Sequence, residues 1–370
     1  MALAVLVRLG FFLWTILFPI ANEMGQPTSP LHFTGVDLEF YYDSVGPYFR
    51  DGLGATLARI VARLGSGQDA WLEIATPGVP ALMLLTDYRP DNTLPLAILY
   101  LLLGIALAIS WLCWLRARGL SFPWLVGFAL LPNPLWYTVA IGSDLPFALC
   151  VMLFCFAATR GEVWGMLAAL FLAIMMRPHG AALAVALPLM LSLQASLRRR
   201  HIVVVAMIYA AVVLAPAPIY VPYFLKFVAD SLRMSFYGAP GQAFFDGLFP
   251  ALPRWLDFVL SCLALAVAKV GYFVGLRPSY GETSLPLVVL RALPGLLLLP
   301  GVLYLCVGGR MTDRVLAAAI ALPAFIGASQ DRYNLAIQPI LYLYGALLWQ
   351  RVWTLVARLF PGQPNGAGSG

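Results

Sequence analysis

Residues 94–115 read LPLAILYLLLGIALAISWLCWL, an apolar run of 22 residues without a charged side chain. A helix of about 22 residues rises roughly 33 Å, which is enough to cross the hydrocarbon core of a bilayer, about 30 Å thick. The stretch therefore predicts a membrane-spanning helix. Arg116 and Arg118 follow it directly, and basic residues next to a span favour the cytoplasmic side, so its end is predicted to lie inside.

Similar apolar runs recur along the whole chain. Hydrophobic residues make up 61% of the sequence and charged residues only 11%, too little polar surface to solvate a soluble domain of this length. Continuous apolar runs favour helices over the alternating pattern of a membrane barrel. We therefore expect an all-α integral membrane protein, a polytopic bundle of about eleven spans near 3–21, 94–115, 122–140, 144–159, 163–176, 180–197, 202–225, 256–276, 285–307, 315–328 and 334–356.

The chain is expected to form one membrane domain over residues 1–360, followed by a disordered tail over 361–370. The run after Arg8 favours a retained first span over a cleaved signal peptide, because no small-residue cleavage site follows it. With the N-terminus inside, residues 22–93 form the first outer loop. In that loop, residues 47–64 have the amphipathic pattern of a helix in the membrane interface or packed on the protein's own surface.

The second half of the chain gives a less consistent topology. Two simple spans at 256–276 and 285–307 would leave the C-terminal Arg351 and Arg358 outside, against the charge rule. One of the two is therefore predicted to be a broken or re-entrant helix. The net charge of +6 comes from short Arg clusters between the spans. We interpret these clusters as signals that orient the chain in the membrane, and we expect no nucleic-acid partner.

The outer loop holds an unusual acidic segment, GVDLEFYYD over residues 35–43, with Asp37, Glu39 and Asp43 immediately after the first span. A carboxylate near apolar walls can serve as a general base, and neighbouring carboxylates can hold Mg²⁺ or Mn²⁺ between phosphate oxygens. No dedicated metal motif is present, so no metal ligands are assigned and the cofactor stays open. The alternative is an ordinary solvated acidic loop. Asp144 opens the span at 144–159 on the same side, as a functional carboxylate or as a helix cap.

Basic residues are predicted on the same outer face. Arg177 and His179 end one span, and Arg332 and Tyr333 precede the last one. Arginine at the mouth of a bundle is suited to bidentate phosphate binding. The other candidates for the phosphate or sugar are Lys269 and Arg277. For each cation alone, the alternative is snorkelling or a structural ion pair.

Three segments together resemble the GT-C class of integral-membrane glycosyltransferases, which use polyprenyl-phosphate-linked sugars. They are the acidic segment 35–43, the Ser143-Asp144 start of a span, and Arg332-Tyr333 with Pro339. The resemblance implies Asp37 as general base, with Glu39 or Asp43 assisting it. It implies that Arg332 binds the lipid phosphate, with Arg177 as a second candidate.

The resemblance further implies a polyprenyl-phosphate-linked sugar donor and a glycan, lipid or protein acceptor within the membrane. The expected location is a bacterial inner membrane with the active site facing the periplasm. Two alternatives stay open: a polysaccharide polymerase or O-antigen ligase, and a transporter or flippase without catalysis. The transporter needs charges along a mid-membrane path, for which only Lys269 and Arg291 qualify.

Overall fold

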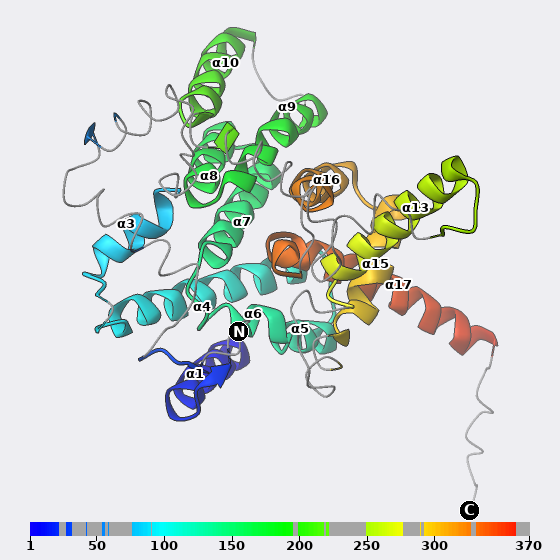
Figure 1. Cartoon of the computed structure of the whole chain (residues 1–370), viewed down its shortest axis with the longest axis horizontal. Helices are drawn as coiled ribbons and strands as arrows, with labels where there is room; N and C mark the ends of the chain where they lie inside the picture. The colour runs from blue at the N-terminus through cyan, green and yellow to red at the C-terminus, as the bar shows by residue number, and fades with distance from the viewer. Residues whose placement is uncertain are drawn as a thin grey trace, which may run out of the picture.

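The structure, a computed structural model, describes residues 1–21, 27–31, 42, 54–55, 58, 76–89, 91–194, 199–217, 220–221, 249–276, 289, 292–326 and 331–359. It confirms an all-α protein, in which the described part forms helices except for one very short hairpin (Figure 1). That hairpin pairs β1 (Ile20–Ala21) antiparallel with β2 (Pro27–Thr28). The expected interfacial helix over 47–64 lies mostly outside the described residues, and the tail over 361–370 lies wholly outside them.

The first part of the bundle is built on α4 (Leu94–Ala117), which matches the apolar run that opened the sequence. α1 (Ala2–Leu17) packs against α4 and also contacts α5 (Phe122–Ala129). The predicted span at 122–140 is not one helix. α5 ends before Pro132, and a short helix, α6 (Pro132–Trp136), follows, because a proline cannot donate the backbone hydrogen bond that would continue α5.

The centre of the fold is a helical hairpin of α7 (Asp144–Arg160) and α8 (Val163–Met176). Gly161 ends α7 with a φ of 69°, a left-handed conformation that glycine adopts without strain. α3 (Gly78–Leu85) packs on α8. The chain continues through a 3-10 turn, η2 (Pro178–Ala181), into α9 (Ala182–Gln194) and α10 (Arg199–Leu214).

The C-terminal helices complete the bundle. They are α13 (Arg254–Phe273), α15 (Gly295–Gly308), α16 (Met311–Ile326), the 3-10 helix η3 (Asp331–Ile337) and α17 (Gln338–Leu359). α15 and α17 approach each other closely because both carry glycine at the contact. A Cβ at Gly301 would overlap the carbonyl oxygen of Leu341, and one at Gly345 would overlap that of Leu297.

Three described helices are long and apolar enough to cross a membrane, namely α4, α13 and α17. They correspond to three of the eleven expected spans. The other apolar helices have 10–17 residues, so they rise at most about 26 Å. Of the two predicted spans with uncertain topology, 256–276 and 285–307, the first corresponds to one continuous helix, α13. The second corresponds to the shorter α15, which begins only at Gly295.

The outer surface is apolar, as expected of a chain in contact with lipid. Large hydrophobic side chains are exposed on many helices, for example Leu6, Leu85, Val267, Val307 and Trp353. Large exposed apolar side chains on many helices are suited to contact with a membrane or another apolar partner. The described structure is therefore that of a helical protein suited to association with a membrane.

An ion pair inside the bundle joins the loop after α4 to the start of α16. Arg118 donates two hydrogen bonds of 2.9 Å to the carboxylate of Asp313 at the start of α16. The Tyr344 hydroxyl donates to the same carboxylate over 2.8 Å and accepts from the backbone N–H of Arg310. The C-terminal end of α4 and the N-terminal end of α16 therefore lie side by side.

Candidate functional site

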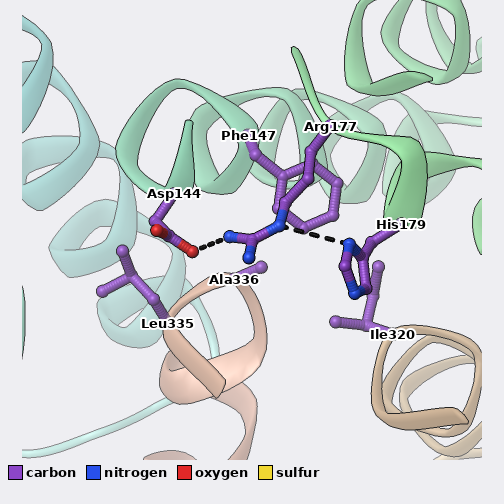
Figure 2. A pocket seen from close by; sticks show the side chains of 7 residues that line it. All are labelled: Asp144, Phe147, Arg177, His179, Ile320, Leu335 and Ala336. Atoms are coloured by element: carbon purple, nitrogen blue, oxygen red, sulfur yellow. Dashed lines mark hydrogen bonds and ion pairs between the residues drawn. The ribbon is translucent and has the colours of Figure 1, made fainter. Parts of the chain in front are cut away.

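Three buried polar side chains, Asp144, Arg177 and His179, form a row in a small pocket (Figure 2). Arg177 lies in the middle: Nη1 forms an ion pair with Oδ1 of Asp144, and Nε donates a hydrogen bond of 3.2 Å to Nδ1 of His179. Because Nδ1 accepts this hydrogen bond, we assign the neutral imidazole with its proton on Nε2. The row therefore holds one negative and one positive group, fixed relative to each other.

The local sequence explains why Arg177 points into this pocket. α8 ends at Met176, and Arg177 adopts an extended conformation with φ −156° and ψ 137°. The following Pro178 disfavours a helical conformation for the residue before it. A Cβ at Gly180 would overlap the backbone of α8 at Ala173, so only glycine lets η2 lie against α8 and bring His179 beside Arg177.

Asp144 is the first residue of α7, and its carboxylate pairs with Arg177. Ser143 stands at the helix cap, but its side chain makes no capping hydrogen bond. Asp144 in the first turn still interacts favourably with the helix dipole. The chain before α7 is fixed by Tyr100 of α4, whose hydroxyl donates to the carbonyl of Gly142 over 2.5 Å.

The walls of the pocket are apolar and come from three separate helical elements. Phe147 of α7 lies behind Arg177, and Ile320 of α16 lies below His179 (Figure 2). From η3, Leu335 lies below Asp144 and Ala336 lies below the Arg177 guanidinium. The cavity is small, about 10 Å³, which is close to the space that one water molecule needs. Apolar walls exclude water, so the charges in the pocket act more strongly on each other and on a bound ion than they would in solvent.

The end of the predicted outer loop is anchored beside Arg177. The Thr76 hydroxyl donates a 3.0 Å hydrogen bond to the carbonyl of Met176, and a Cβ at Gly78 would overlap the backbone of Met176. Tyr42, which directly precedes Asp43, packs edge to face on Tyr88 with 5.7 Å between ring centroids. The last residues of the predicted outer loop, from Thr76 onward, therefore contact the backbone of Met176, directly before Arg177.

The structure brings together three of the predicted site residues, Asp144, Arg177 and His179. Four predicted residues lie outside the described part of the chain: Asp37, Glu39, Asp43 and Arg277. Arg332 and Tyr333 belong to the backbone of η3, the element that supplies Leu335 and Ala336, while their side chains are outside the description.

Lys269 does not line this pocket, and its assignment as a candidate phosphate ligand stays a prediction. It is half-buried on α13, and it is absent from the residues that line the pocket. α13 instead contacts η3 at its end, where the Asn334 side chain donates a 2.5 Å hydrogen bond to the carbonyl of Phe273. α13 therefore supports the wall of the pocket. The polar side chains of the pocket come from α7, the end of α8 and η2.

No pattern in the sequence predicts the apolar wall of the pocket. Ile320, Leu335 and Ala336 are ordinary residues of apolar segments, and they follow Asp144 by 176 to 192 residues in the sequence. Phe147 follows Asp144 by three residues, so helical spacing alone places these two on one face. Only this pair within the pocket has a relation that periodicity could have predicted.

Within the described residues, no group of three His, Cys, Asp or Glu side chains is placed to hold a metal ion. The described part of the site therefore consists of a buried cation, its carboxylate partner and a neutral imidazole. Comparison of the chain with protein-family models, with characterised proteins and with solved structures found no match.

Proposed function

We propose that this chain is an integral-membrane glycosyltransferase of the GT-C type, which transfers a sugar from a polyprenyl-phosphate donor to a glycan, lipid or protein acceptor. The observation that carries the proposal is Arg177, a buried guanidinium held from both sides by Asp144 and His179 in an apolar pocket. Its planar fork is suited to bidentate contact with phosphate. A cation fixed in this way is typical of a site that binds an anion together with an apolar tail.

The chemistry of such a transfer uses a fixed cation directly. The acceptor hydroxyl attacks the anomeric carbon, the bond from that carbon to the phosphate oxygen breaks, and the phosphate leaves with additional negative charge. A guanidinium already in position stabilises this developing charge more than it stabilises the bound donor, which lowers the barrier. Arg177 is the proposed phosphate ligand, and Arg332 in η3 is the second.

The proton of the acceptor hydroxyl needs a separate base. Asp144 is a poor candidate, since its ion pair with Arg177 favours the charged carboxylate and occupies its oxygen. We therefore keep Asp37 as the proposed base, with Glu39 or Asp43 assisting or holding a divalent metal ion. The anchoring of Thr76 beside Arg177 supports this arrangement, because it returns the outer loop to the pocket.

The proposed membrane arrangement extends beyond the three long helices. We propose that the shorter apolar helices also cross a bacterial inner membrane, where local thinning of the bilayer or snorkelling of flanking side chains accommodates a rise below about 30 Å. The N-terminus then lies in the cytoplasm, and the Arg177 pocket opens toward the periplasm.

The test uses the full chain in proteoliposomes with a panel of polyprenyl-phosphate-linked sugars, a labelled sugar and membrane lipid as acceptor. We expect Arg177→Lys, which keeps the charge and removes the fork, to lower sugar transfer by about 100-fold, the usual cost of losing one transition-state contact. The matched control is Arg160→Gln at the opposite end of α7, where the side chain is 68% exposed. It should transfer at the wild-type rate.

Two further outcomes separate the proposal from its alternatives. Asp37→Asn should bind polyprenyl phosphate normally and transfer no sugar; normal transfer at equal protein level removes Asp37 as the base. Movement of the labelled donor across the bilayer without a new glycosidic bond identifies a transporter, and joining of long preformed glycans identifies a polymerase or ligase.

A further inference from the structure

α17 changes its surroundings half-way along its length. Residues 338–346 are all buried in the bundle, where the helix packs closely on α15. Residues 351–359 are all exposed, so the described part of the protein does not enclose this half of the helix. Figure 1 shows the same half running away from the body of the bundle toward the C-terminus. Residues 348–359 are called the α17 extension below.

The side chains of the extension divide into two faces. Successive residues of a helix are turned by about 100°, which gathers the polar side chains into one stripe made of Gln350, Arg351, Thr354 and Arg358. The rest of the surface is apolar, with Leu348, Val352, Leu355 and Leu359 opposite the stripe and Trp349 and Trp353 along one edge. Arginine on the polar face with tryptophan and leucine on the other is typical of a helix that lies in a membrane interface.

Hydrogen bonds at Tyr344 fix the level at which α17 leaves the bundle. Its hydroxyl donates to Asp313, the partner of Arg118 directly after α4, and accepts from the backbone N–H of Arg310. Basic residues next to spans favour the head-group level on the cytoplasmic side. α17 therefore reaches this level close to Tyr344, although fifteen of its residues, 345–359, still follow. These rise about 22 Å, so a single straight span does not account for the whole helix.

We propose that the α17 extension lies along the cytoplasmic surface of the membrane and binds anionic phospholipid head groups through Arg351 and Arg358. Charge complementarity supports this occupant, because arginine is the only charged residue type in the extension. The exposed Trp353 and Leu359 supply the apolar surface that enters the upper part of the acyl chains.

The start of the extension is held beside the bundle by a second contact. The Arg351 guanidinium lies 5.1 Å from the centroid of the Tyr304 ring of α15, a distance suited to a cation–π interaction. Arg358 lies two helical turns further along the same stripe. The placement of the extension does not depend on the proposed transferase activity, and it gives α17 a different path from the single span predicted over 334–356.

The experiment measures the depth of the extension in vesicles that contain the full chain, phosphatidylcholine and phosphatidylglycerol. A fluorescent amino acid replaces Trp349, and its quenching is compared between lipids with a nitroxide on the head group and lipids with a nitroxide deep in the acyl chain. Position 349 is at the middle of α17, so a spanning helix would place it at the bilayer centre. We expect the head-group nitroxide to quench more strongly. Val352 is the second probe position if the first variant does not fold.

The matched depth control carries the same probe in place of Ala106, an exposed residue at the middle of α4. There the deep nitroxide should quench more strongly. The lipid preference is measured with nitroxide-labelled phosphatidylglycerol against nitroxide-labelled phosphatidylcholine. One arginine near an anionic surface contributes about fivefold in affinity, so Arg358→Gln should lower the preference for phosphatidylglycerol by about this factor. Arg160→Gln removes an exposed charge from the end of α7 and should leave the preference unchanged.

Three results would overturn the proposal. Stronger quenching by the deep nitroxide at positions 349 and 352 would show that α17 spans the bilayer. Weak quenching by both nitroxides, with energy transfer between labelled chains, would show that a second copy covers the extension. An unchanged lipid preference in Arg358→Gln would show that the arginines of the extension do not bind anionic head groups.

Discussion

Replacing Asp144 with alanine leaves the Arg177 guanidinium in a buried pocket without its carboxylate. Asp144 and Arg177 are only 7% and 6% exposed, and His179, which accepts a hydrogen bond from Arg177, carries no charge in the assigned tautomer. Removing one partner of a buried ion pair typically costs about 3–5 kcal/mol, because the other charge stays buried. We therefore expect Asp144→Ala to lower the free energy of unfolding by about 4 kcal/mol.

The corresponding change in melting temperature follows from the size of the chain. Unfolding entropy of about 2.1 cal/mol/K per residue over 370 residues gives about 0.8 kcal/mol/K. A loss of about 4 kcal/mol then lowers the Tm by about 5 °C. The double variant Asp144→Ala with Arg177→Met removes both charges, so most of this loss should be recovered.

The assay is thermal unfolding of the detergent-solubilised full chain, followed by intrinsic fluorescence. Asp87→Asn is the control, because Asp87 pairs with Arg89 on the surface, where their side chains are 83% and 65% exposed. An exposed pair contributes little to stability, so its Tm should stay within about 1 °C of the wild type. If Asp144→Ala shifts the Tm no more than this control, or the double variant recovers nothing, Arg177 is not held as a buried charge.

Two further substitutions test the packing that positions the site. Gly345→Ala should lower the Tm by several degrees and broaden the size-exclusion peak, because its Cβ would overlap the carbonyl oxygen of Leu297. The control is Gly10→Ala, which has open space around the added Cβ and should leave the Tm unchanged. Equal Tm values for the two variants would refute the close contact. Asp313→Asn should also lower the Tm by about 5 °C, because Arg118 loses a bidentate partner inside the bundle. An unchanged Tm would show that this ion pair contributes nothing to stability.

The helical character of the protein could be predicted from the sequence with good agreement in the long apolar runs. The run at 94–115 corresponds to α4, and the prediction at 163–176 has the same bounds as α8. The prediction failed at 122–140, where the apolar composition continues but Pro132 divides the helix. Hydropathy averages over a window, so it does not detect a local loss of one backbone donor.

The candidate site was predicted only in part. Asp144, Arg177 and His179 were selected individually for their chemistry, each with a structural role as the alternative. Their association in one row, with Arg177 in the centre, depends on how α8 turns into η2 and meets the start of α7. Lys269 had equally suitable chemistry, but α13 places it elsewhere.

The sequence by itself determined that the chain is helical and apolar, and which ionisable groups were available. These properties are sums over neighbouring residues, so they can be obtained from a continuous stretch. Only the tertiary structure decided which charges meet. The Arg177 pocket needs α7, η2, α16 and η3 to converge, and the Arg118 ion pair needs the end of α4 to meet the start of α16. A charge in an apolar chain is a solvated surface group or a strongly interacting buried one depending on these neighbours, because the local dielectric sets the strength of its interactions.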